Sequence, residues 1–392
     1  MLEITVNKKT AELLSKGFPW ILKNQLIGRN SALDLADPGE LCAIITEKGK
    51  KLGMGYFNPG TQISARVLTM NPSQKINSDF FKEKFTAAIK RRRKNFHENY
   101  FRAVYGEADQ LPGLIVDLYG EYAVAQVNSA GMENLQDHWL PALIDAMHLK
   151  GVFLDGTSKH RTREGIGLRS ELLFGEIPEI VEVRENNLTY YADVVNGQKT
   201  GWFYDQRKNR HMLSMIASGK SVLDLYTHSG GFGLLCANNN ASEVVMVDSS
   251  DLALSLAEQA SRKNELNNCY FIRSDVFGYL DATKKHNKQF AIVNADPPAF
   301  IKSRHDITVG LKGYEKLTKK CVELVSRGGV FAISSCSYFA RPDIFRAAIE
   351  NALKHTGREF ELLFKLGADK DHPIHPMLAE TNYLKFLVYR LD

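Results

Sequence analysis

The sequence predicts an α/β fold with a doubly wound, mostly parallel sheet in its C-terminal half, and three observations carry this prediction. Two apolar runs, at residues 222–225 and 244–247, are typical of buried strands. A glycine-bearing turn and a helical stretch separate the runs, and Asp248 closes the second one. Ligands of such sheets bind beyond the carboxyl ends of the strands, so residues 221–250 predict a nucleotide site.

The turn of this unit does not settle which nucleotide binds. It reads T-H-S-G-G-F-G over residues 227–233 and therefore lacks the G-x-G-x-x-G fingerprint. Its three glycines allow the backbone to approach a ligand closely. Asp248 stands where such sheets place an acceptor for ribose hydroxyls. Taken alone, the unit suits NAD and S-adenosylmethionine equally, and it also suits an ordinary βαβ unit without a ligand.

Size and composition restrict the class of protein. The chain has 392 residues, of which 44% are hydrophobic and 24% charged, which predicts two or three globular domains. No run approaches the roughly 18 apolar residues of a membrane span, and the first residues lack the apolar segment of a secretory signal. Five scattered cysteines argue against a metal site or disulfides and for a reducing cytoplasm. The net charge of +5 permits a polyanionic partner without demanding one.

Three successive domains are expected, at residues 1–72, 73–195 and 196–392. The first is β-rich, because residues 41–46 and 63–68 are typical of short strands between glycine and proline turns, after a short helix that ends at Gly17.

The second domain is expected to be α/β. A helix over residues 79–98 ends in five consecutive basic residues, which are either a solvated helix end or a phosphate contact. Residues 100–128 predict three strands, and residues 157–165 predict a basic loop. Residues 182–193 predict a hairpin that turns at Asn186–Asn187.

The third domain continues the alternation of strands and helices. Further strands are expected at residues 270–272, 289–295 and 328–334, and two closing strands at 359–365 and 384–391. This is the arrangement of class I methyltransferases. Three loops should then meet at one crevice: the glycine turn, D-P-P-A-F at 296–300 and S-C-S at 335–337.

Cys336 indicates the chemistry. Two prolines hold an open loop against a planar ring, as a base methyltransferase needs, but amino-methylating enzymes use the same loop. Carbon 5 of cytosine is a poor nucleophile until a thiolate adds to carbon 6, and Cys336 in its polar loop suits that role. A thiol with a pKa of about 8.5 needs help to ionise. A helix start near Pro342 and the charge of Arg341 are the candidates.

Several motifs together resemble one known family. Residues 16–20, 38–39, 53–59 and 65–68 resemble a PUA domain, a small RNA-binding barrel, although related chains usually have His where Phe18 stands. Over nearly the whole chain, GFPW at 17–20, GEADQLPGLIVD at 106–117, KTGWFYDQR at 199–207, DLYTHSGGFG at 224–233, DPPAF at 296–300, SCS at 335–337, DHP at 371–373 and YLK at 383–385 resemble the bacterial ribosomal RNA large subunit methyltransferase I family.

The resemblance implies an N-terminal PUA β-barrel, a central α/β domain and a class I (Rossmann-like) methyltransferase domain. It implies S-adenosylmethionine as cofactor, large-subunit ribosomal RNA as partner, and 5-methylcytosine as product. Cys336 would be the nucleophile, and Asp296 would hold the cytosine edge. The implied cofactor-binding residues are Asp224, Tyr226, Ser229, Gly230, Gly231, Phe232, Asp248, Ser249, Asp275, Val276, Asp296, Gln206 and Arg207. The expected RNA-binding residues are Lys16, Trp20, Arg91, Arg92, Arg93, Arg161, Arg163 and Arg210.

Some questions stay open at this level. Many RNA cytosine-5 methyltransferases carry a second cysteine where this chain has Ala299, so the base that removes the carbon-5 proton is unassigned among His228, Lys302 and Tyr314. A guanine methyltransferase of related fold, which tends to have Asn at the place of Cys336, is the alternative enzyme. A non-catalytic RNA-binding or assembly factor is the alternative class, and a nicotinamide oxidoreductase is disfavoured by the missing fingerprint. An open edge of the N-terminal barrel would also allow a homodimer.

Overall fold

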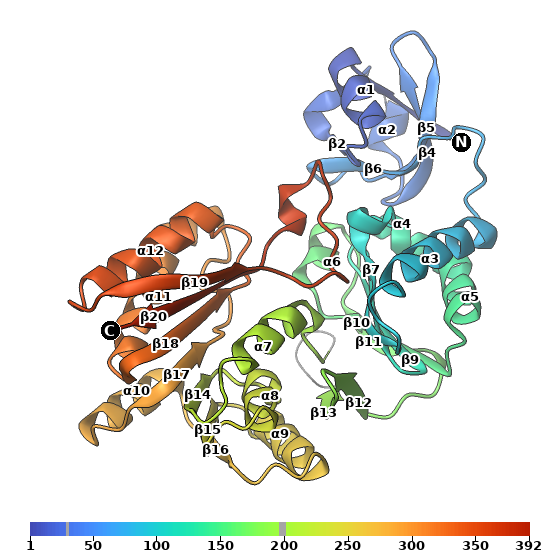
Figure 1. The fold of residues 1–392 in the computed structure, drawn as a ribbon. Helices are drawn as coiled ribbons and strands as arrows, with labels where there is room; N and C mark the ends of the chain where they lie inside the picture. The colour runs from blue at the N-terminus through green and yellow to red at the C-terminus, as the bar shows by residue number, and fades with distance from the viewer. Residues whose placement is uncertain (29–30, 196–200) are drawn as a thin grey trace. The chain divides into compact units, whose positions relative to one another are not determined.

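The computed structural model describes residues 1–28, 31–195 and 201–392 (Figure 1). The chain folds into two compact units, each built from separated segments. The N-terminal unit comprises Met1–Val181, Asp193–Trp202 and Lys370–Thr381. The C-terminal unit comprises Glu182–Ala192, Phe203–Asp369 and Asn382–Asp392. The division into three successive domains at 72/73 and 195/196 stays a prediction. Two short segments belong to a different unit from the residues that precede them: Glu182–Ala192 is part of the C-terminal unit, and Lys370–Thr381 is part of the N-terminal unit.

A six-stranded sheet opens the N-terminal unit, in the order β2-β6-β5-β4-β1-β3. Its strands are β1 Leu2–Val6, β2 Trp20–Leu22, β3 Leu26–Ile27, β4 Glu40–Thr46, β5 Lys51–Phe57 and β6 Ile63–Thr69, with helices α1 Lys8–Ser15 and α2 Ser31–Asp34. Apolar side chains such as Ile4, Ile21, Ile44 and Phe57 are fully buried between these elements. The strands expected at 41–46 and 63–68 and the short N-terminal helix are therefore confirmed.

A second sheet of the same unit has the order β11-β10-β9-β8-β7. Its strands are β7 Tyr100–Tyr105, β8 Leu114–Tyr119, β9 Tyr122–Val127, β10 Gly151–Gly156 and β11 Arg169–Gly175, with helices α3 Ser78–Arg92, α4 Ala130–Asn134, α5 Gln136–Met147 and α6 Lys159–Arg163. Helices α3 and α5 pack together over a core that includes Phe81, Phe85 and Trp139.

The prediction of a loop at residues 157–165 is wrong, because Lys159–Arg163 form the short helix α6. Ser158 caps this helix by accepting a hydrogen bond from the backbone N–H of His160. Arg161, which is 1% exposed, turns inward and pairs with Glu133 at 2.9 Å. The many basic residues of this segment predicted a solvated loop, but Arg161 is buried and ion-paired.

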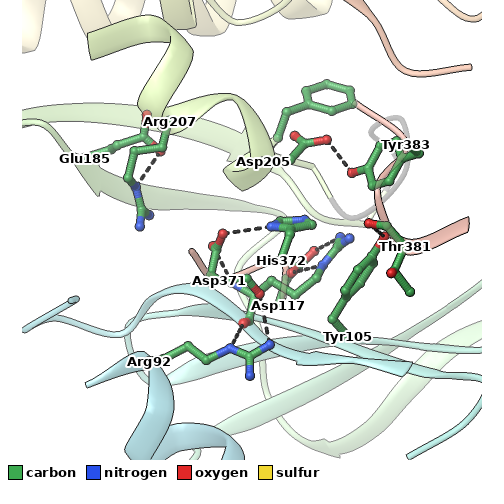
Figure 2. Close-up of polar contacts among 12 residues, drawn as sticks. Arg92, Tyr105, Asp117, Glu185, Asp205, Arg207, Asp371, His372, Thr381 and Tyr383 are labelled. Atoms are coloured by element: carbon green, nitrogen blue, oxygen red, sulfur yellow. Dashed lines mark hydrogen bonds and ion pairs between the residues drawn. The ribbon is translucent and has the colours of Figure 1, made fainter. Parts of the chain in front are cut away.

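Residues 370–381 return from late in the sequence to the N-terminal unit, and a buried ion-pair network holds them there (Figure 2). Arg92 binds both carboxylate oxygens of Asp109, at 2.5 and 2.6 Å, and also donates to the carbonyl of Asp371 at 2.9 Å. The carboxylate of Asp371 accepts from the backbone N–H of Arg102 and contacts the ring of His372. The D-H-P motif at 371–373 is thus an attachment point.

The C-terminal unit contains a seven-stranded sheet in the order β16-β15-β14-β17-β18-β20-β19. Its strands are β14 Ser221–Leu225, β15 Glu243–Asp248, β16 Cys269–Arg273, β17 Phe290–Ala295, β18 Val325–Ser335, β19 Phe360–Leu366 and β20 Lys385–Leu391. The pairings among the first five are parallel, and β20 is antiparallel to both of its neighbours. The predicted doubly wound sheet with its closing pair of strands is confirmed.

Helices cover both faces of this sheet (Figure 1). They are α7 Arg207–Ser214, α8 Gly231–Asn238, α9 Asp251–Lys263, α10 Val276–Lys285, α11 Ile307–Val322 and α12 Pro342–Lys354. α8 contacts α7 and α9, whereas α11 contacts α10 and α12 and shares a core with Leu223, Leu225 and Val293.

A separate hairpin, β12 Ile180–Glu185 and β13 Leu188–Asp193, turns at Asn186 and Asn187. Both asparagines have positive φ angles, 52° and 63°, as the predicted tight turn requires.

Candidate active site

The site begins where the strand order of the C-terminal unit reverses, between β14 and β17. The last residues of these strands, Leu225 and Ala295, are register partners. The glycine turn and the D-P-P-A-F loop therefore start side by side, and the backbone N–H of Asp296 donates to the carbonyl of Leu225 at 3.3 Å. Open α/β sheets bind their ligands at such a reversal, beyond the carboxyl ends of the strands.

The glycine turn holds an unusual backbone. Tyr226, His228 and Gly230 have φ angles of +59°, +53° and +83°. A residue with a side chain pays about 1–2 kcal/mol for this region, so two of them close together indicate a turn fixed by its surroundings. A Cβ at Gly230 would lie 2.8 Å from Leu234 and 3.0 Å from Ala257, so only glycine fits there. Residues 226–233, called the glycine cradle below, form a tight turn in which the N–H of Gly230 donates to the carbonyl of Thr227 at 3.0 Å.

Asp224, on β14, stabilises this turn through buried hydrogen bonds. Its side chain is 1% exposed and accepts hydrogen bonds from Thr227 Oγ1 at 2.6 Å, Asn294 Nδ2 at 2.8 Å and the backbone N–H of Gly233 at 2.9 Å. Burial raises the pKa of this carboxyl to about 6. The expectation that Asp224 binds the cofactor is corrected, because its carboxylate is directed into the protein and shapes the turn.

Other expected cofactor residues differ in how much surface they offer. Phe232 is 5% exposed and stacks on Phe386, Val276 is 4% exposed in the core, and Ser229 is 1% exposed. The side chains of these three residues therefore pack inside the unit. Tyr226 is half-buried, and Ser249 is exposed.

Two carboxylates stand at the ends of neighbouring strands. Asp248, at the end of β15, accepts from the backbone N–H groups of His228 and Ser250, both at 2.9 Å. Asp275 caps α10 by accepting from the N–H of Gly278 at 2.8 Å and is exposed. Each carboxylate is oriented by the backbone and keeps acceptor capacity, which suits the hydroxyl and amino groups of an adenosine.

Gln206 orients the acid of the D-P-P-A-F loop. Its Nε2 lies 2.9 Å from both carboxylate oxygens of Asp296 and 3.2 Å from Ser334 Oγ, while its Oε1 accepts from Asn209 at 2.6 Å. The side chain is 3% exposed. The expectation that Gln206 lines an entrance is therefore corrected: it is a buried support for Asp296.

Arg207 and Arg210 share one buried carboxylate, that of Glu185 from the hairpin. Figure 2 shows the contact between Arg207 and Glu185. Arg210 binds Glu185 at 2.6 and 2.9 Å, and Arg207 lies 3.2 Å from it. The side chains of Glu185 and Arg210 are 0% and 4% exposed. Neither arginine lines an open entrance, so the cofactor-binding expectation for Arg207 and the RNA-binding expectation for Arg210 are corrected. The residues 197–200 that precede this segment lie outside the described residues.

Cys336 follows β18 in a loop that several elements hold. Tyr314 on α11 shares a hydrogen bond with Ser335 Oγ at 2.9 Å, and Ser337 Oγ accepts from the N–H of Ile301 at 3.3 Å. The second bond ties the S-C-S loop to the residue just after D-P-P-A-F. Cys336 itself is half-buried. In contrast, burial raises the pKa of Cys42 to about 12 and that of Cys269 to about 11, and the pKa values of Cys236 and Cys321 rise further.

Two groups considered for helping the chemistry have other partners. Arg341, expected to assist the thiol, pairs with Asp343 at 2.7 Å on the surface. Tyr314 is fully buried, and burial raises its pKa, which disfavours it as a base. Lys385 on β20 was missed: its side chain is 5% exposed, and its Nζ donates to the carbonyls of Ser337 and Tyr383. Only the strand register, which pairs Ser335 with Lys385, reveals it.

The expected RNA-binding residues separate into exposed and buried groups. Lys16, Arg93 and Arg163 are exposed, and Arg91 is half exposed while pairing with Asp109. Trp20 is half-buried and donates its indole N–H to Glu107 at 2.8 Å. Arg92 and Arg161 are each 1% exposed and bound to carboxylates, so the expectation that they contact RNA is corrected. Burying a cation requires such a partner, which a run of basic letters does not show.

Comparisons with known proteins agree with this architecture. The family model described as S-adenosylmethionine-dependent methyltransferase matches residues 145–390, and a PUA-like domain model matches residues 4–70. A protein of Aeromonas salmonicida named ribosomal RNA large subunit methyltransferase I is 33% identical over 358 residues, covering 90% of each chain. A protein of the same name from Escherichia coli O139:H28 is 29% identical, covering 100% of this chain and 99% of the other.

Solved structures show the same fold. A methyltransferase crystallised with SAH matches with a TM-score of 0.84, and an S-adenosylmethionine-dependent methyltransferase from Streptococcus mutans matches with a TM-score of 0.82. Both are 21% identical and cover 100% of each chain.

The strand order, the glycine cradle and these matches define an S-adenosylmethionine-dependent class I methyltransferase with a PUA-like N-terminal domain. More narrowly, the chain belongs to the ribosomal RNA large subunit methyltransferase I family. Within the described part of the chain, no helix is long and apolar enough to cross a membrane.

Proposed function

We propose that this protein methylates carbon 5 of a cytosine in large-subunit ribosomal RNA through a covalent bond between Cys336 and carbon 6 of the base. The names of the family members support the RNA substrate. The position of Cys336 carries the chemistry: the thiol lies in a loop that hydrogen bonds tie to the D-P-P-A-F loop at the strand ends.

The cradle fits the cofactor. Gly230 and Gly231 stand at the strand end, in a tight turn with positive φ at Gly230, where the methionine part of S-adenosylmethionine would lie. Asp248 would accept from the ribose hydroxyls, and Asp275 would accept from the adenine amino group. When bound, S-adenosylmethionine supplies an electrophilic methyl group on a sulfonium.

The residues of the chain make the cytosine ring able to accept that group. The Cys336 thiolate adds to carbon 6, the new S–C bond forms, and the electron pair of the 5,6 double bond makes carbon 5 nucleophilic. Asp296, oriented by Gln206, holds the polar edge of the ring. After methylation a base takes the proton from carbon 5, the double bond reforms, and the S–C bond breaks to return the thiolate. The raised pKa of Tyr314 argues against this residue as that base, which leaves His228 and Lys302 as the candidates.

RNA contact is proposed for the exposed residues Lys16, Arg91, Arg93 and Arg163 and for the half-buried Trp20. Lys16 caps the end of α1 and Trp20 opens β2, both within the PUA-like match, while Arg91 and Arg93 lie at the end of α3 and Arg163 ends α6. The proposal includes a cytoplasmic protein, consistent with its five free cysteines. Two further hypotheses are independent of this function. One is the division into domains at residues 1–72, 73–195 and 196–392, and the other is a homodimer formed through the edge of the first sheet.

The test is the methylation of large-subunit RNA prepared from cells that lack this protein. The wild-type protein with S-adenosylmethionine is expected to give 5-methylcytosine at one site, located by nucleoside mass mapping. Cys336→Ala should abolish the product while calorimetry still detects cofactor binding. Full activity of Cys336→Ala, or a methylated guanine in place of cytosine, would contradict the proposal. Absence of cofactor binding would favour a non-catalytic RNA-binding protein.

A further inference from the structure

A buried lysine lies directly beneath the loop that carries Cys336. Lys385 is the first residue of β20 and pairs in register with Ser335, the residue before Cys336. Its Nζ donates to the carbonyl of Ser337, the residue after Cys336, and to the carbonyl of Tyr383 at 2.7 Å. Lys385 therefore contacts the S-C-S loop on both sides of the thiol.

The surroundings of Lys385 are unusual for a cation. Its side chain is 5% exposed, and lysine is rarely buried unless it is paired. Both hydrogen-bond acceptors of Nζ within the described ranges are backbone carbonyls, which satisfy donors without neutralising a charge. Burial lowers the pKa of Lys385 to about 8, and the opposing cause is the negative charge of Cys336. The geometry thus places a buried ammonium against the loop that carries Cys336.

We infer that Lys385 is a positioning residue for Cys336: its ammonium fixes the S-C-S loop and is the counter-ion of the Cys336 thiolate. Opposite charges attract far more strongly in a buried site than in water, and a thiol ionises more readily beside a lysine. Arg341, the cation nearest to Cys336 in sequence, pairs with Asp343 on the surface and leaves this role to Lys385. The consequence for methyl transfer rests on the proposed function, whereas the effect on the thiol does not.

Other ionisable groups around the loop are already occupied. The hydroxyl of Tyr314 on α11 is hydrogen-bonded to Ser335, and its pKa is raised by burial. The hydroxyl of Tyr383 donates to Asp205. Neither tyrosine supplies a positive charge, whereas Lys385 does.

The charge of Lys385 can be separated from its hydrogen bonds by two substitutions. Lys385→Gln keeps a donor for the carbonyls and removes the charge, while Lys385→Arg keeps the charge. Lys365→Met on the neighbouring strand β19 is a matched control, because Lys365 is exposed. The readout is the rate at which iodoacetamide alkylates Cys336 in the full-length protein without RNA, followed by peptide mass mapping between pH 6.5 and 10.

We expect Lys385→Gln to alkylate about tenfold more slowly than wild type at pH 7, because one pKa unit changes the thiolate fraction tenfold. The difference should shrink above pH 8, where wild-type Lys385 loses its own proton. Lys385→Arg should restore most of the rate, and Lys365→Met should match wild type. Circular dichroism and calorimetric cofactor binding check that each variant is folded.

Equal alkylation of wild type and a folded Lys385→Gln at pH 7 would overturn the counter-ion role. If Lys385→Gln does not fold, the decision passes to Lys385→Arg: its rate must stay close to wild type at pH 7 and, because arginine keeps its charge, must not show the change that wild-type Lys385 undergoes as it loses its proton above pH 8. The proposed function fails separately: wild type that yields no 5-methylcytosine refutes that function even if alkylation shifts as expected. Conversely, methylation by wild type with unshifted alkylation in Lys385→Gln refutes only this inference.

Discussion

Removal of Glu185 should destabilise the C-terminal unit strongly. Glu185 is 0% exposed and compensates Arg210, which is 4% exposed, and Arg207, which is 10% exposed. Breaking a buried ion pair by deleting one partner costs about 3–5 kcal/mol, because the remaining charge stays buried and unpaired. Glu185→Ala and Arg210→Met should each reduce the free energy of unfolding by about that amount. Replacement of both partners, Glu185→Met with Arg210→Met, should cost less than either single change suggests.

Urea denaturation of the full-length protein, followed by far-ultraviolet circular dichroism, measures this prediction. With a slope of about 2–3 kcal/mol per molar urea, each single variant should lower the midpoint of the C-terminal transition by about 1–2 M. The double variant should lie closer to wild type, because the more deeply buried cation, that of Arg210, is removed together with its carboxylate. Additive losses in the double variant would refute the argument. So would an Arg210→Met protein of normal stability that binds RNA more weakly.

The remaining predictions concern the cradle and the RNA surface. Asp224→Asn should cost about 1–3 kcal/mol, because the new amide N–H₂ replaces one of two oxygens that both accept hydrogen bonds and so must face at least one donor, and it should weaken S-adenosylmethionine binding in calorimetry; unchanged stability would contradict the buried role. The pKa of Asp224 in the folded protein, about 6, lies above its unfolded value near 3.9, so its contribution to the free energy of unfolding is present below pH 4 and lost as the pH rises through 6. Urea midpoints at pH 4.5 and 6.5 should therefore differ less in Asp224→Asn than in wild type, and an identical difference would refute the assignment. Gly230→Ala should abolish cofactor binding because its Cβ would collide with Leu234 and Ala257, and normal binding would show that the turn yields. Arg93→Gln should lower the salt slope of RNA binding by about one while Arg92→Gln lowers stability instead; the reverse pattern would contradict their burial.

Local sequence patterns predicted the strands and loops that position the site. Apolar runs bounded by glycine and acids located β14, β15 and β17, and the order of strands then followed from the alternation with helices. The Asn186–Asn187 turn was predictable because a two-residue hairpin turn needs positive φ angles at both positions, and asparagine is one of the few residue types that adopt them readily. The three loops of the site are the ones that D-P-P-A-F, S-C-S and the glycine turn indicated.

Charged residues were predictable only in part. Arg92, Arg161 and Arg210 belong to basic stretches of the sequence, and such stretches predict solvent-exposed side chains. Their partners Asp109, Glu133 and Glu185 lie 17, 28 and 25 residues away in sequence, so the burial of the pairs depends on tertiary structure. Gln206 and Asp296 are 90 residues apart. Lys385 is 49 residues beyond Cys336, and only the antiparallel register of β18 and β20 brings it beneath the S-C-S loop.

The central claim, a covalent bond from Cys336 to carbon 6, is tested most directly with RNA that carries 5-fluorocytidine at the modified position. Fluorine cannot leave as the proton does, so the bond should persist after methylation. We predict a protein–RNA adduct that resists denaturation, requires S-adenosylmethionine, maps to Cys336 by peptide mass spectrometry and is absent in Cys336→Ala. Methylation of unmodified RNA without any such adduct, or an adduct that survives in Cys336→Ala, would contradict the account.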